Sequence, residues 1–360
     1  MTIRKTDEDA YFAASNSAGG FCSYYPQCFD AARVGHVYAV KGGPGTGKSR
    51  FLRDVAEYGE RVGWRSEYIY CSSDPDSLDG VILTGEARCI ALMDATAPHV
   101  YEPSHPGVRE DIVNLGSFWD IDLLSEHAGE IGELNAQKSE AYRQAYRFLS
   151  GAGEMSRTRD ELVAPFVKRE AVQRFAERLM QDIPMGEEYS VHPALISSVG
   201  MRGEVAFDTY FANAKKLFLI EDCRGSAQYL MQELGELAVK KRLSVRVSHD
   251  PIMPDRIDGI LLCESGVVFA IAPTEECELP HKKIGMRRFV ETSRMKRVRG
   301  VLNYTERMRR AMLDGAVERL ARVREVHFRI EELYISAMDF PAKETFTKSF
   351  CEKLFGLQNS

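Results

Sequence analysis

With 360 residues, 44% of them hydrophobic and 28% charged, the chain has enough apolar material for two domains with full cores, and its formal net charge is −6 at pH 7. No stretch approaches the roughly 18 uninterrupted apolar residues of a membrane span, and the N-terminal residues lack the apolar core of a signal peptide, so we expect a cytoplasmic protein with no membrane partner. Its eight cysteines form no C-x-x-C pair, which argues against a zinc ribbon or a disulfide framework.

Short apolar runs alternate with a helical segment in the first part of the chain. The segment after the first run has apolar residues at helical spacing, beginning with Phe51, Leu52 and Val55. This alternation predicts the βαβ units of a parallel sheet with helices on its faces. The expected strands are 36–40, 67–71, 81–83 and 89–93.

The pattern becomes helical after Pro106. We expect helices over 108–115, 120–149 and 155–181, with Gly151 and Gly153 breaking the last two apart.

The order of runs then repeats. The expected strands of this second part are 217–220, 244–248, 260–263 and 267–271, and a helix over 303–337 follows. The predicted organisation is a nucleotide-binding domain over 1–150, a helical linker over 151–190 and a related domain with a basic helical end over 191–360.

A phosphate-binding loop lies between the first expected strand and the first expected helix. Residues 42–49 read G-G-P-G-T-G-K-S, the complete G-x-x-x-x-G-K-[ST] motif. Glycines let successive backbone N–H groups surround phosphate oxygens, Lys48 reaches the β- and γ-phosphates, and the Ser49 hydroxyl can bind Mg²⁺. No N-K-x-D motif is present, and this absence favours ATP only weakly, so the sequence does not decide between ATP and GTP. We assign nucleotide binding to Gly42, Gly43, Pro44, Gly45, Thr46, Gly47, Lys48, Ser49 and Arg50.

Asp94 ends the apolar run 89–93 and is expected to hold Mg²⁺ together with Ser49. The alternative is an aspartate that caps a turn. Ala95 follows, where many hydrolytic members of this class have a water-activating glutamate. A general base must therefore come from elsewhere, and Asp74 joins Lys48 and Asp94 as an expected catalytic residue, although a turn cap explains Asp74 as well. The candidate bases are Asp74, Asp76, Asp79, His99 and Glu102.

An internal repeat relates the two parts of the chain. The segment 12–20 has a counterpart in 195–203, and Asp79-Gly80 has a counterpart in Asp258-Gly259. We also match His99 to His281. Because both of these features persist in the second copy, we interpret them as structural, the Asp-Gly pair as a tight turn and the histidines as loop caps.

The second copy lacks the phosphate loop. Residues 221–228 read E-D-C-R-G-S-A-Q, so no glycine cradle and no lysine precede Gln228, and two carboxylates would repel a triphosphate. The counterpart of Asp94 is Ala272 or a neighbour. We predict a copy that binds no nucleotide.

A basic stretch over 282–310 contains eleven lysines and arginines against Glu291 and Glu306. It predicts contact with a polyanion or a protein partner. The alternative is a solvated helix face that pairs with the acidic first half.

Three segments, 41–49, 71–80 and 94–99, resemble those of uncharacterised bacterial proteins with two tandem P-loop ATPase-like halves. The resemblance covers nearly the whole chain, and it implies a P-loop NTPase fold in both halves. The chain departs from members whose second half also carries a phosphate loop.

We therefore expect an ATP-binding, Mg²⁺-dependent ATPase with one competent half and a regulatory or partner-binding copy. A small-molecule or nucleotide kinase remains open, with residues 72–76 and an arginine such as Arg109, Arg143 or Arg147 holding the acceptor. A nucleotide sensor without turnover also remains open. The sequence does not predict the oligomeric state.

Overall fold

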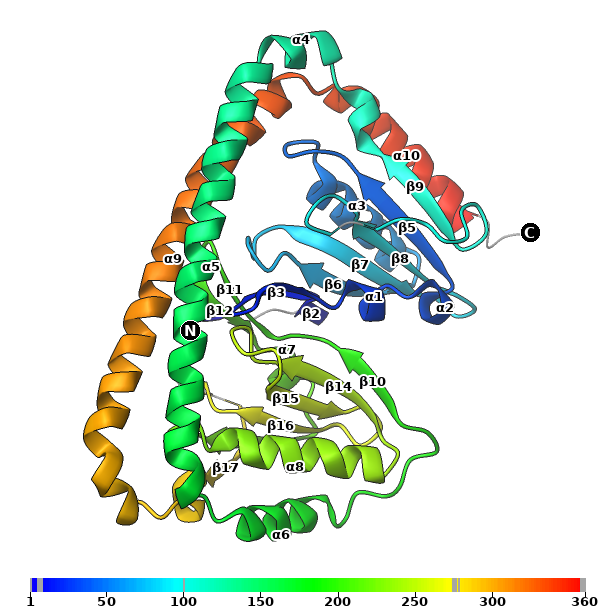
Figure 1. Cartoon of the computed structure of the whole chain (residues 1–360). Helices are drawn as coiled ribbons and strands as arrows, with labels where there is room; N and C mark the ends of the chain where they lie inside the picture. The colour runs from blue at the N-terminus through cyan, green and yellow to red at the C-terminus, as the bar shows by residue number, and fades with distance from the viewer. Residues whose placement is uncertain (1, 5–8, 100, 274–276, 278, 357–360) are drawn as a thin grey trace.

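The computed structural model describes residues 2–4, 9–99, 101–273, 277 and 279–356. In this part of the chain, two six-stranded sheets are arranged one above the other, and two long helices run side by side past both of them (Figure 1). The predicted α/β fold, with a duplicated, mostly parallel sheet flanked by helices, is confirmed.

The first sheet has the strand order β2-β6-β7-β8-β5-β9. Strand β7 is antiparallel to both of its neighbours, whereas the other three strand pairs are parallel. The sheet is therefore mixed, with three parallel pairs and two antiparallel ones. Residues 85–88 join β7 to β8 as a hairpin, and so short a connection cannot make the crossover that parallel strands require. The strands are β2 (Asp9–Phe12), β5 (His36–Lys41), β6 (Arg65–Tyr70), β7 (Leu78–Thr84), β8 (Cys89–Asp94) and β9 (Glu110–Asn114).

The second sheet repeats this arrangement strand for strand, in the order β10-β14-β15-β16-β13-β17. Its central strand β15 is again antiparallel to both neighbours. The internal repeat predicted from the sequence is confirmed. The strands are β10 (Ser190–Pro193), β13 (Lys216–Glu221), β14 (Ser244–His249), β15 (Ile257–Leu262), β16 (Val267–Ile271) and β17 (Lys282–Gly285).

A pseudo-two-fold axis relates the two sheets. Phe12 and Leu195, which are counterparts in the repeat, exchange both backbone hydrogen bonds, at 2.7 and 3.1 Å. A bridge between equivalent residues places the axis between them. Short strands around this bridge form two smaller sheets: β1 (Thr2–Arg4), β11 (Ser197–Gly200) and β12 (Gly203–Phe207) in one, and β3 (Ala14–Ser17) and β4 (Gly20–Ser23) in the other.

Residues 108–115, expected as a helix, form edge strand β9 and the start of a 3₁₀ turn, so that prediction was wrong. Val113 is buried and Ile112 is exposed, which is the alternation of an edge strand. Pairing with β5 satisfies the backbone of β9, a tertiary contact that overrides the local pattern.

The two long helices are α5 (Ala128–Val163) and α9 (Arg299–Ser336). The predicted break at Gly151 and Gly153 was wrong, because α5 continues through both. A Cβ at Gly153 would collide with Ala18, so this glycine allows a close approach and does not end the helix. The single helix expected over 155–181 is instead divided by a 3₁₀ turn that contains Pro165.

Each long helix is followed by a helix that packs beside the sheet of the other half: the helix after α5 beside the second sheet, and the helix after α9 beside the first (Figure 1). Helix α6 follows α5 and packs on α8 of the second sheet, where Val172 and Leu230 share a core. Helix α10 follows α9 and packs on α3 of the first sheet, where Phe355 and Phe51 share a core. The helices are α3 (Lys48–Arg61), α6 (Arg169–Met180), α8 (Ala227–Lys240), α10 (Phe340–Gly356) and the shorter α1 (Tyr25–Cys28), α2 (Ala31–Val34), α4 (Ile121–Glu126) and α7 (Thr209–Ala212), with 3₁₀ turns η1 (Leu115–Phe118), η2 (Ala164–Phe166), η3 (Met286–Phe289) and η4 (Arg294–Val298).

Residue 150, the expected domain boundary, lies within α5. The last helix of the range 191–360 completes the core of the first sheet. No helix in the described part of the chain is both long and apolar enough to cross a bilayer.

Candidate functional site

The glycine-rich loop (residues 42–49) joins β5 to α3 at the carboxyl end of two adjacent parallel strands, β5 and β8. This edge is where open α/β sheets bind ligands. Gly45 and Gly47 have φ of +72° and +74°, a region that strains other L-residues. The Thr46 hydroxyl donates to the Gly43 carbonyl at 2.9 Å and closes the turn. The loop therefore has the curvature that a phosphate cradle needs.

Lys48 and Asp94 are brought together at this edge. The Lys48 Nζ donates to the carbonyls of Gly42 and Gly43, at 2.8 and 2.9 Å, and lies 3.6 Å from the Asp94 Oδ2. Burial raises the pKa of the Asp94 carboxyl, while the charge of Lys48 offsets part of that rise. The N–H of Thr96 donates to the Asp94 Oδ1 at 2.8 Å and fixes its orientation.

Ser49 and Arg50, the last two predicted nucleotide-binding residues, begin helix α3. The Ser49 Oγ accepts the Leu78 N–H at 2.9 Å, which holds the hydroxyl between the loop and β7. The Arg50 side chain is 70% exposed and pairs with Asp54 at 2.8 Å along the helix.

Asp79 lies beside the Lys48–Asp94 pair, at a β-bulge near the start of β7. Its carboxylate is 3.1 Å from the His99 Nε2, and both side chains are buried. The charge of Asp79 acts on Asp94 and further raises its pKa. Asp258 occupies the same kind of bulge in β15. The prediction of a tight turn at these Asp-Gly pairs was wrong, because the bulge absorbs the extra residue within a strand.

His281 is not the counterpart of His99. The residue after it, Lys282, lies opposite Phe218, as Asp111 lies opposite Tyr38, so strand register matches His281 to Glu110. The predicted match was therefore wrong, because the strand spacing after the fourth strand differs between the copies.

The same register gives Ile271 as the counterpart of Asp94. This is the residue next to Ala272.

Asp74 lies at the contact between the halves. The neighbouring Ser73 carbonyl accepts the Met201 N–H at 2.7 Å. Burial raises the pKa of Asp74, and Arg202 and Arg324 are among the charges near it. In the described part of the chain, no hydrogen bond or ion pair joins Asp74 to Lys48 or Asp94, so the structure does not bring this third expected catalytic residue to them.

The end of helix α9 covers the glycine-rich loop. A Cβ built on Gly45 would lie 2.8 Å from the Glu331 carbonyl oxygen and 3.1 Å from Ile335. A Cβ built on Gly43 would lie 3.1 Å from Trp119 and 3.5 Å from Tyr334. The neighbouring residues therefore leave no room for a side chain at Gly43 or Gly45, and a bound phosphate would need the same space.

The charges and donors of the glycine-rich loop act on the Glu331 carboxylate. Burial would raise the pKa of Glu331, but His327 at 3.5 Å, the Gly45 N–H and the charge of Lys48 outweigh burial, and the pKa lies below its ordinary value. The Glu331 carboxylate is thus stabilised by an N–H of the kind that binds phosphate oxygens. Burial lowers the pKa of Lys138 on α5, and Glu331 and Lys48 are the charges that act on it.

In the second half, an aspartate fills the corresponding position. Asp222 accepts the N–H groups of Gly225 and Ala227, at 2.7 and 2.8 Å, at the start of α8. Ala227 begins α8 as Lys48 begins α3. The donors that would hold a phosphate are therefore already satisfied by a carboxylate of the chain itself.

The basic stretch 282–310 pairs mainly within the second half. Lys283 is 3.6 Å from Glu221, and Arg310 is 2.9 Å from Glu204. Arg309 pairs with Glu306 on the same helix at 2.7 Å. These ion pairs neutralise part of the positive charge of the basic stretch, and their acidic partners lie in the second half.

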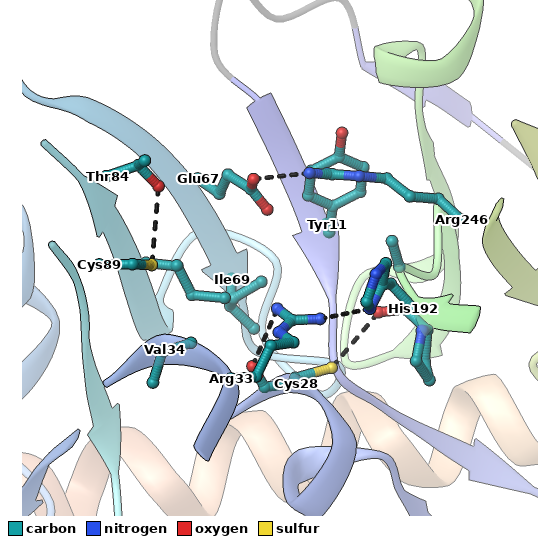
Figure 2. Close-up of a pocket in the computed structure, with 13 residues that line it drawn as sticks. Tyr11, Cys28, Arg33, Val34, Glu67, Ile69, Thr84, Cys89, His192 and Arg246 are labelled. Carbon is teal, nitrogen blue, oxygen red and sulfur yellow. Dashed lines mark hydrogen bonds and ion pairs between the residues drawn. The ribbon is translucent and has the colours of Figure 1, made fainter. Parts of the chain in front are cut away.

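A cavity of about 270 Å³ lies between the two sheets (Figure 2). Glu67 and Arg246, which occupy equivalent strand positions, pair across it at 2.6 Å, and Arg246 lies over the Tyr11 ring. Arg33 contacts His192 at 2.8 Å. Opposite charges at equivalent positions hold the halves together, and the cavity is separate from the glycine-rich loop.

No family model, no curated protein and no solved structure matches the chain. The site is therefore interpreted from its own residues. Sequence reasoning predicted Lys48, Asp94 and the loop, which the structure brings together, but it did not name Glu331 or Lys138, because nothing local marks residues that a distant helix brings to the loop. The helical patterns expected over 120–149 and 303–337 contain Lys138 and Glu331, but they do not show which sheet each helix approaches.

Proposed function

We propose that the chain binds Mg²⁺ and ATP at the glycine-rich loop of its first half and hydrolyses the nucleotide. The observation that carries the proposal is the position of Lys48, 3.6 Å from Asp94, within a glycine loop at the carboxyl ends of adjacent parallel strands. The resemblance of segments 41–49 and 71–80 to tandem P-loop ATPase-like proteins agrees with it.

The residues have distinct roles in this proposal. Lys48 exchanges the Gly42 and Gly43 carbonyls for β- and γ-phosphate oxygens, and backbone N–H groups of the loop bind the remaining oxygens. The Ser49 hydroxyl and the Asp94 carboxylate are hard oxygen donors that suit Mg²⁺.

No cluster of three or more His, Cys, Asp or Glu residues suited to a metal occurs among the described residues. Mg²⁺ does not need one, because it is bound by one or two carboxylates together with the phosphates of the substrate. The ion would neutralise charge on the transferring phosphoryl group.

The second half serves in the proposal as a regulatory or partner-binding copy. Asp222 satisfies the N–H donors at the start of α8, and Ile271 replaces the metal carboxylate. Its basic stretch 282–310 remains a candidate surface for a protein or a polyanion.

Thermal unfolding with and without Mg·ATP, together with phosphate release, tests the proposal. The unsubstituted chain should be stabilised by Mg·ATP and release phosphate, Lys48→Ala should lose both responses, and Gln228→Ala in the first turn of α8 should retain them. Equal losses from both substitutions would contradict the assignment of a single competent half.

A nucleotide sensor is the second candidate, because Glu331 and the end of the 38-residue helix α9 rest on the loop. A ligand that displaces them would move the end of α9, and the movement would extend along the helix. Nucleotide binding with neither phosphate release nor ADP formation would favour the sensor, and ADP formation that requires an added acceptor would identify a kinase, which transfers the phosphoryl group to that acceptor.

A further inference from the structure

Lys343 is a buried lysine in the first turn of α10. Lys343 is only 3% exposed to solvent. Burying an ammonium group costs several kcal/mol unless a partner compensates it. Within the described part of the chain, no hydrogen bond or ion pair of this ammonium is found, and the nearby carboxylate of Asp54 is already paired with Arg50 at 2.8 Å.

The Lys343 ammonium faces the glycine-rich loop. A Cβ built on Gly47 would lie 3.3 Å from the Lys343 Nζ and 3.7 Å from its Cε. Gly47 is the residue before helix α3, whose first N–H groups form a natural anion-binding position. Two independent features, an unpaired ammonium and a helix N-terminus, thus converge on one point.

Burial lowers the pKa of Lys343, and the charge of Asp54 opposes this only in part. A bound phosphate at the same point would stabilise the charged form. A bound anion would thus offset the cost of burying the Lys343 charge.

The second half shows that packing alone does not require a lysine at this position. Trp119 bridges to Met338 just as Val290 bridges to Val167, so these pairs are equivalent. Lys343 lies five residues after Met338, and Val172 lies five residues after Val167. Val172 is 1% exposed in an apolar core beside α8. The ammonium therefore occurs in the copy with an intact loop and is replaced by an apolar side chain in the other.

We infer that Lys343 is a phosphate-binding residue of the nucleotide site, brought to the glycine-rich loop by the exchanged helix α10. This inference rests on the proposed function. Gly47 lies at the part of the loop that cradles the α- and β-phosphates. Lys343 therefore binds oxygens that ADP and ATP share, whereas Lys48 extends to the γ-phosphate. The second half of the sequence completes the site of the first.

Calorimetric titration of Lys343→Met with Mg·ADP and with a non-hydrolysable ATP analogue tests the inference. Both affinities should fall by about tenfold or more, since a charge-assisted contact to phosphate is lost. The nucleotide-free thermal midpoint should stay the same or rise, because an unpaired buried charge is removed. Lys348→Met, an exposed position on the same helix, is the control and should bind like the unsubstituted chain.

Two outcomes contradict the inference in different ways. Unchanged affinity in Lys343→Met, with or without a lower midpoint, overturns the assignment and leaves the proposed function intact. No binding by the unsubstituted chain overturns the proposed function and this assignment together. If circular dichroism shows that Lys343→Met does not fold, Lys343→Gln carries the test, because glutamine removes the charge and keeps a polar end group.

Discussion

Glu331→Gln should strengthen nucleotide binding. The Gly45 N–H acts on the Glu331 carboxylate and lowers its pKa, so a phosphate that uses this donor must compete with an anion. A hydrogen bond to a charged group is worth about 1.5–3 kcal/mol and a neutral one about 0.5–1.5 kcal/mol. Because the side chain is 28% exposed and solvent screens its charge, we take about 1–1.5 kcal/mol as the difference. The affinity should therefore rise by roughly tenfold.

Calorimetric titration with Mg·ADP and a non-hydrolysable ATP analogue measures this effect. Glu332→Gln, the exposed neighbour on the same helix, is the matched control and should leave affinity unchanged. Unchanged or weaker binding by Glu331→Gln would refute the competition argument. Normal binding with lost phosphate release would instead identify Glu331 as the general base that the sequence after Asp94 lacks.

Three further substitutions test the fold, one at the bulge of the second half and two beside the site. Burial raises the pKa of Asp258 from 3.8 to about 6, so its contribution to stability is present below pH 3.8 and is lost as the pH rises through 6. Compared with Asp258→Asn, the unsubstituted chain should lose up to about 3 kcal/mol over this window, measured by thermal unfolding at each pH, and parallel pH profiles would contradict this. His99→Ala leaves the buried Asp79 unpaired and should cost about 3–5 kcal/mol in denaturant unfolding, and a loss below 1 kcal/mol would contradict a structural pair. Gly45→Ala places a Cβ 2.8 Å from the Glu331 carbonyl at positive φ and should lower both the thermal midpoint and ADP affinity, whereas a neutral effect would show that α9 does not rest on the loop.

The fold was predictable because the repeat and the apolar runs are local signals. The same order of apolar runs occurs twice in the chain, so each copy supports the prediction made from the other. The loop between β5 and α3 was recognised from consecutive residues. The direction of β7 and the strand β9 were missed because hairpin length and edge pairing decide them, and apolar periodicity reports neither.

The site was predictable only where it is continuous in sequence or follows a strand. Lys48 and Asp94 meet because parallel strands end at one edge, which is a general property of the fold. Glu331 and Lys343 reach the loop through helices exchanged between the two sheets, and no short-range pattern encodes that exchange. Asp74 was placed correctly near a strand end, but the second half packs on it.

Calorimetric titration of the full chain with Mg·ATP, read for stoichiometry, tests the central claim most directly, with phosphate release measured on the same sample. One site per chain together with phosphate release is the predicted result, since Asp222 and Ile271 leave the second half without donors or a metal carboxylate. Two sites per chain, or no binding at all, would contradict the account.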